Sequence, residues 1–102
     1  SAVNTVNVGN GMSVTATIST NANKVGGKVT ISGAATGGAG SYQYKFIVYN
    51  KTTKTWGLVQ NFSSNNAITW VAGTAGDREF YIDVKDADGN VARSAVMNVI
   101  TK

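Results

Sequence analysis

Tyrosine and tryptophan side chains are the groups in this chain whose types and spacing best suit chemistry, because they fall on the polar side of expected strands. Residues 41–49 and 78–85 alternate with a period of two, which is typical of β-strands with one buried face. By this parity Tyr49 and Tyr81 point away from the core. Trp56 lies near the start of the next expected strand, so the three rings form a platform if their strands are neighbours in one sheet.

An aromatic platform of this kind is a candidate carbohydrate site. Flat ring faces stack on the apolar C–H surface of sugars, while amide and charged neighbours bind the hydroxyl groups. Gln43 and Lys45 share the outer face of the expected strand 41–49 and would supply those polar groups. The alternative is that the rings stabilise the sheet by cross-strand contact or meet an adjoining module, and the sequence leaves both interpretations open.

Paired carboxylates are the remaining acid–base groups. Glu79 and Asp83 share the outer face of one expected strand but lie about 13 Å apart, too far for either glycosidase geometry. We expect them to be solvated charges beside Lys45 and Lys85. The sequence contains no His and no Cys, which removes the commonest general base, metal ligand and thiol nucleophile. It therefore predicts a protein that is not an enzyme, with no catalytic residues and no cofactor.

Oxygen-bearing side chains gather near the end of the expected strand 78–85, at Asp83, Asp86, Asp88 and Asn90. Calcium is one interpretation, but Val84 stands where an EF-hand has its first ligand and no Glu closes the loop. A tight hairpin with Gly89 at positive φ is sufficient explanation. On that interpretation Asp86→Asn is nearly silent; whether the hairpin holds calcium stays open.

Turn residues divide the chain into short strands, spaced roughly as in a β-sandwich of about seven strands. The expected strands are residues 3–8, 13–19, 28–32, 41–49, 55–61, 66–71, 78–85 and a less regular 91–100. Tyr44, Phe46, Ile82 and Val84 are expected in the core, and a bulge near Ser94 and Ala95 would reconcile the parities of the last strand. The glycine-rich residues 36–41 are expected to form a flexible connection between the sheets. The fold class is thus an all-β antiparallel sandwich.

Length and charge restrict the possible partners. The 102 residues suit one domain, residues 1–102, with its own core. Nine basic and five acidic residues give a net charge of +4, but the basic residues never form a run, so nucleic-acid binding is not expected. No apolar stretch reaches the length of a membrane span, so membrane insertion is not expected either.

A family resemblance rests on residues 40–46 (GSYQYKF), Trp56, Ala75-Gly76 before residues 80–84 (FYIDV), and residues 88–90 (DGN). Together they resemble the triple-tyrosine type (Y_Y_Y) of Ig-like and fibronectin-type-III-like module found in bacterial surface or secreted multidomain proteins. The resemblance covers residues 38–99. It implies an Ig-like sandwich, an extracellular location, and neighbouring domains of the same polypeptide as partners.

Two functions follow as expectations. The first is a non-catalytic extracellular module of a larger bacterial protein, which acts as a spacer, presentation or interaction domain. The alternative is a carbohydrate-binding module that recognises a polysaccharide or cell-wall glycan through Tyr49, Trp56 and Tyr81, with Gln43 and Lys45 beside them.

Overall fold

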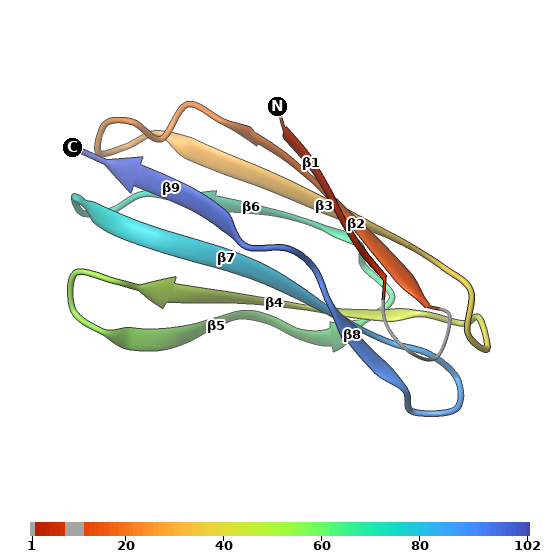
Figure 1. Ribbon diagram of the computed structural model, residues 1–102. Helices are drawn as coiled ribbons and strands as arrows, with labels where there is room; N and C mark the ends of the chain where they lie inside the picture. Colours follow the sequence, from red (N-terminus) through yellow and green to blue (C-terminus); the bar gives the residue numbers. More distant parts are fainter. Residues whose placement is uncertain (1, 8–11) are drawn as a thin grey trace.

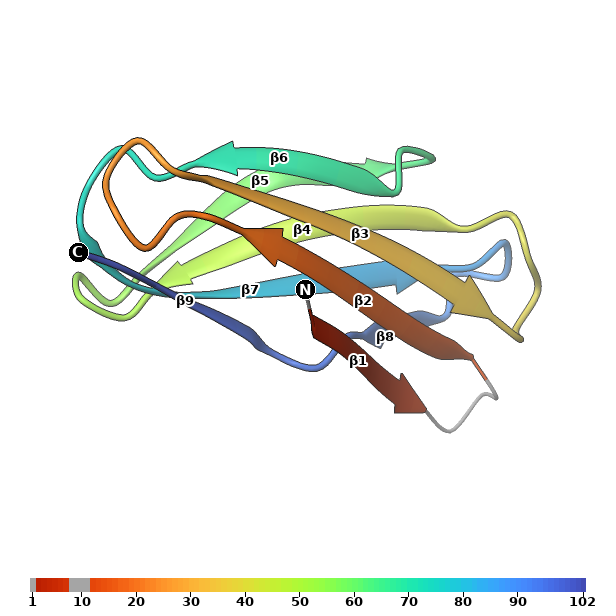
Figure 2. The same cartoon turned by 90° about the horizontal axis from the view of Figure 1, so that it is seen from above.

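Two antiparallel sheets make up the protein in the computed structural model, which describes the backbone of residues 2–7 and all of residues 12–102 (Figure 1). The first sheet has the order β1-β2-β3-β6, from β1 (Ala2–Asn7), β2 (Ser13–Thr20), β3 (Lys28–Thr36) and β6 (Ala67–Val71). The second has the order β5-β4-β7-β8, from β5 (Thr55–Ser63), β4 (Gln43–Asn50), β7 (Gly76–Lys85) and β8 (Val91–Arg93), and β9 (Met97–Thr101) also pairs with β7. Seen from above, the first sheet lies over the second (Figure 2).

The expected all-β class is confirmed, with nine strand segments among the described residues rather than about seven. Part of the difference is the last expected strand, which forms two segments along the same edge of β7. The first expected turn, at residues 9–11, lies outside the described residues. No helix occurs in the described part of the chain, and hence none there that would span a membrane.

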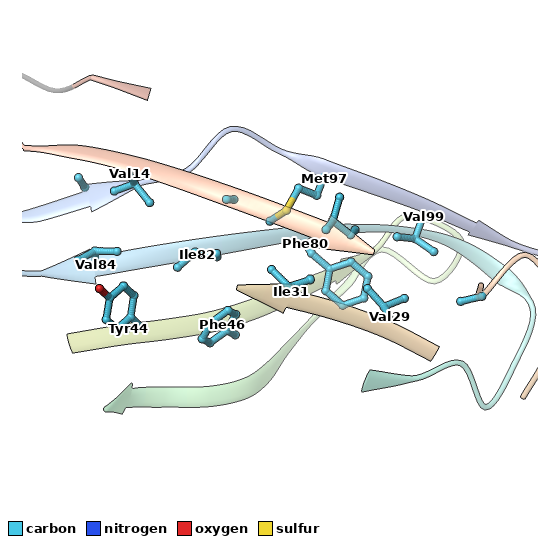
Figure 3. Packing of buried hydrophobic residues seen from close by; sticks show 14 of the residues in the cluster. Val14, Val29, Ile31, Tyr44, Phe46, Phe80, Ile82, Val84, Met97 and Val99 are labelled. Atoms are coloured by element: carbon cyan, nitrogen blue, oxygen red, sulfur yellow. The ribbon is translucent and has the colours of Figure 1, made fainter. Parts of the chain in front are cut away.

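The core lies between the two sheets and is filled by alternate residues of their strands (Figure 3). Period-two alternation places these side chains on one face of each strand, as the sequence predicts. The four residues expected in the core are confirmed there: Tyr44, Phe46, Ile82 and Val84 are all buried. Opposite them lie Val14, Ala16, Ile18, Val29 and Ile31 of the first sheet.

Strands β4 and β7 are neighbours, and this pairing determines which side chains share the outer face of the second sheet. Ile47 lies opposite Tyr81, and Phe46 lies opposite Ile82. Because directly opposed residues share a face, the buried and exposed sets of the two strands coincide. The neighbour relationship on which the aromatic platform depends is therefore present.

The irregularity expected in the last strand is present between β8 and β9. The Ser94 N–H donates to the Ile82 carbonyl at 2.8 Å, and the Ser94 hydroxyl oxygen accepts the Ile82 N–H at 3.0 Å. Ser94 thus satisfies both backbone groups of Ile82 where the regular ladder stops. The parity changes across this break, so Ala92 before it and Met97 after it are both buried.

Arg78 on β7 lies inside the protein, on the same face as Phe80. It is only 5% exposed, and its guanidinium lies 4.8 Å from the Trp70 ring centroid. Two guanidinium nitrogens donate to Thr74, one to the backbone carbonyl at 3.1 Å and one to the hydroxyl at 2.6 Å. Trp70 in turn meets Phe80 edge-on at 5.2 Å. Arg78 is therefore a packing residue at this end of the core.

Candidate functional site on the outer face of the second sheet

The three predicted rings meet on the outer face of the second sheet. Tyr49 and Trp56 are directly opposed on β4 and β5, with ring centroids 4.6 Å apart and planes tilted by 45°. The Trp56 ring is also 5.8 Å from that of Tyr81 on β7, at 39°. Because β4 runs between β5 and β7, the indole lies across β4. We call Tyr49, Trp56 and Tyr81 the aromatic cluster.

The β4–β5 turn fixes Trp56 opposite Tyr49. The Asn50 side-chain oxygen accepts the N–H groups of Thr52 and Thr53 at 3.0 and 3.1 Å. Lys54 takes a positive φ of 59°, which turns the chain back into β5. Because the Asn50 side chain bonds the backbone of its own turn, residues close together in the sequence determine the register of β4 and β5 at this end.

Trp56 is the most open member of the aromatic cluster. It is 60% exposed, whereas Tyr49 and Tyr81 are half-buried. Next to it Leu58 is 58% exposed, so a continuous apolar surface begins at the indole. A shallow hollow of about 540 Å³ borders this surface, and its lining residues are Lys45, Ile47, Trp56, Gly57, Leu58, Asn61 and Arg93.

Asp83 lies opposite Lys45, as expected, but the expectation that it is solvated is wrong. It is 8% exposed, and its two oxygens accept hydrogen bonds from Arg93 Nε at 2.7 Å and Nη2 at 3.1 Å. The hydrogen bonds to Asp83 raise the pKa of the Arg93 guanidinium, which stays charged. Arg93 also lies 5.1 Å from the Tyr81 ring centroid, so this ion pair supports one side of the aromatic cluster.

Glu79 is hydrogen-bonded to one member of the aromatic cluster, Tyr81. The Tyr81 hydroxyl donates to Glu79 Oε1 at 3.3 Å. Burial, followed by the charge of Glu79 and this hydrogen bond, raises the pKa of Tyr81, so the phenol stays protonated. Within the described residues no group of three or more acidic side chains is arranged to hold a metal ion.

Of the two polar residues predicted for the site, Lys45 lies at the hollow and Gln43 does not. Lys45 lines the hollow, and its Nζ lies 5.6 Å from the Phe62 ring centroid. Gln43 is exposed at the far end of β4, opposite Lys85 and outside the hollow. Phe62 was missed because the expected strand ended at residue 61, whereas β5 continues to Ser63. Two register shifts in the β4–β5 ladder also bring Asn61 into the hollow.

Both oxygens of the Asp86 carboxylate accept hydrogen bonds from protein donors. Its Oδ1 accepts the N–H groups of Asp88 and Asn90 at 3.0 and 2.9 Å, and its Oδ2 accepts the Ala39 N–H at 3.1 Å and the Asn90 amide at 3.0 Å. The Asn90 side chain, followed by these backbone N–H groups, lowers the pKa of Asp86. Gly89 has a φ of 85°, as the hairpin prediction requires. Asp86 is only 4% exposed, so the expectation that Asp86→Asn is nearly silent is revised.

The glycine-rich connection runs between the two sheets, as expected, and the hairpin after β7 binds it. Besides the bond from Ala39 to Asp86, the Ala87 N–H donates to the Gly40 carbonyl at 3.0 Å. Gly38 has a φ of 63°, and a Cβ added there would lie 2.7 Å from Asp86 Oδ2, so both the backbone conformation and the close approach favour glycine. Asp86 therefore holds two loops together at one end of the protein.

No protein-family model, curated protein or solved structure matches this chain. The resemblance to triple-tyrosine modules accordingly stays a prediction.

Proposed function

We propose that this chain is a non-catalytic carbohydrate-binding module and that the aromatic cluster is its binding surface. The observation that carries the proposal is the 60% exposure of Trp56, an indole held at a defined angle by Tyr49 and Tyr81. A large exposed ring in fixed contacts is a preorganised surface, so a ligand that stacks on it loses little entropy from ordering the protein.

Sugar rings fit such a surface because one side of a pyranose presents C–H groups while its edge presents hydroxyls. The exposed indole and Leu58 offer the apolar area, and Lys45, Asn61 and Arg93 offer polar groups at its border. Neighbouring rings are tilted by 45° and 39°. Such a surface suits a single glycan chain that twists along its length better than it suits the flat face of a crystalline polysaccharide.

The non-catalytic part of the proposal is supported by the state of the carboxylates. Asp83 is bound by Arg93 through both oxygens, and Glu79 accepts a hydrogen bond from Tyr81. Both carboxylates are therefore engaged by protein donors, and the sequence offers no His as a general base and no Cys as a nucleophile.

The second candidate function is the spacer, presentation or interaction module. The contacts within the aromatic cluster favour it, because cross-strand aromatic pairs stabilise a sheet without any ligand. Both candidates are consistent with an Ig-like or fibronectin-III-like sandwich in an extracellular, secreted or cell-surface bacterial protein. In either case we infer neighbouring domains of the same polypeptide as partners.

Tryptophan fluorescence distinguishes the two functions. The chain has two tryptophans, and Trp70 packs between Arg78 and Phe80, so a ligand on the outer face should change the emission of Trp56. We expect saturable quenching or a shift with at least one member of a panel of soluble starch, xylan, glucan, pectin and peptidoglycan fragments. The change should weaken in Tyr81→Ala, which keeps Trp56 as the reporter, and persist in Val71→Ala, an exposed residue on the other sheet. Silence across the panel would favour the spacer.

A further inference from the structure

The polar border of the hollow is made almost entirely of hydrogen-bond donors. Lys45 and Arg93 carry positive charge and have no acceptor atom. Asn61 is the third polar side chain in the lining, and its carbonyl oxygen already accepts the Phe62 N–H at 2.8 Å. No carboxylate belongs to the lining. The oxygens of sugar hydroxyls can accept hydrogen bonds from these donors, but the hydroxyl protons find few acceptors here, so a ligand group that only accepts fits the border better.

Arg93 is held in place and retains free donors. Its Nε and Nη2 donate to Asp83, which leaves Nη1 for a ligand, and its side chain is half exposed. Because Asp83 fixes the plane of the guanidinium, Arg93 does not have to be ordered when an anion binds.

Lys45 adds a positive charge to the border, although Asp83 stands opposite it in the β4–β7 ladder. Its Nζ and that of Lys85 lie 5.6 and 4.6 Å from the Phe62 ring centroid, so both ammonium groups gather around one ring. Among the described residues neither lysine forms an ion pair, since the pairs present are Lys51–Asp77 and Arg93–Asp83. On this face the cationic side chains of Lys45, Lys85 and Arg93 therefore outnumber the carboxylates of Asp83 and Glu79, and hydrogen-bond donors border the hollow.

We propose that the ligand is an acidic polysaccharide whose sugar rings carry carboxylates, that is, a polyuronate. One ring stacks on Trp56, and its carboxylate lies at the border formed by Lys45 and Arg93. This inference rests on the proposed carbohydrate-binding function and specifies its ligand class. A carboxylate has acceptors only, so it complements a border that has almost only donors.

Calorimetric titration with oligogalacturonate and with its methyl ester tests the inference, because the two ligands share the sugar ring and differ in charge. We expect the acid to bind about tenfold more tightly than the ester, as one charge-assisted hydrogen bond implies. Raising the salt from 50 to 500 mM should reduce the difference. Lys45→Gln should remove most of it, while Lys24→Gln, which changes an exposed lysine between β2 and β3, should leave it unchanged.

The outcomes separate this inference from the proposed function. Equal binding of acid and ester, or binding of neutral glycans alone, would overturn the acidic ligand and leave carbohydrate binding intact. Oligogalacturonate binding that survives Trp56→Ala would indicate attraction to charge alone, and would also overturn it. Absence of binding to every glycan would overturn both.

Discussion

The ring of Trp56 on β5 lies 5.8 Å from that of Tyr81 on β7, although β4 runs between the two strands. The contact exists because the β4–β5 and β4–β7 registers place Tyr49 opposite Trp56 and Ile47 opposite Tyr81. The proposed binding surface is therefore a product of three paired strands, and a shift of one residue in either ladder would remove it.

Truncating Phe46 should destabilise the protein strongly, because this ring is buried between the sheets. We expect Phe46→Ala to lower the free energy of unfolding by about 3–5 kcal/mol through lost burial and the cavity left behind. Urea denaturation followed by circular dichroism measures the change. A midpoint close to that of the wild type would contradict the position of Phe46 in the core.

Replacing Asp86 should destabilise the protein in a pH-dependent way. The hydrogen bonds that lower the folded-state pKa of Asp86 stabilise the fold above the unfolded-state pKa of about 3.9, and this stabilisation is lost as the pH falls through the lower folded-state value. Asp86→Asn should therefore lower the melting temperature by several degrees at pH 7, and the difference from wild type should shrink below about pH 4.

Asp88→Asn is the matched control for Asp86. Asp88 is exposed and enters the same network through its backbone N–H, so its variant should melt like the wild type. Added calcium should not raise the melting temperature of the wild type, because protein donors already occupy the Asp86 oxygens. A calcium-dependent rise abolished by Asp86→Asn would contradict this account of the hairpin.

Gly89 should resist substitution because of its backbone conformation alone. Its φ is 85°, and a Cβ added there would meet no atom within 4 Å, so no clash is involved. We expect Gly89→Val to cost about 1–3 kcal/mol of stability, and Gly89→Asn clearly less, because Asn tolerates the left-handed region. Equal losses for Val and Asn in thermal denaturation would be inconsistent with this explanation.

Strand alternation was enough to predict the faces of β4 and β7, and with them the buried Phe46 and the outward Tyr49 and Tyr81. Alternation works there because each strand is buried on one side only, so its period is visible in the sequence. The asparagine and glycine turns that join the strands were visible for the same local reason.

Contacts between distant segments were not predictable in this way. Asp83 was assigned to solvent because its partner, Arg93, lies on β8, and the register of that short strand depends on the hairpin before it. Asp86 binds the N–H of Ala39, which is 47 residues away in the sequence. The register shifts that bring Asn61 into the hollow leave no signature in a period-two pattern.

The most direct test of the carbohydrate-binding surface is calorimetric titration of the wild type and Trp56→Ala with the glycan that gives the strongest fluorescence response, with Val71→Ala as control. We predict saturable binding by the wild type and by Val71→Ala. Trp56→Ala should lose about 1–3 kcal/mol of binding free energy, by analogy with bases stacked on aromatic side chains, and should still unfold cooperatively. Equal affinity of Trp56→Ala and wild type, or no binding by the wild type, would contradict the claim that the aromatic cluster binds carbohydrate.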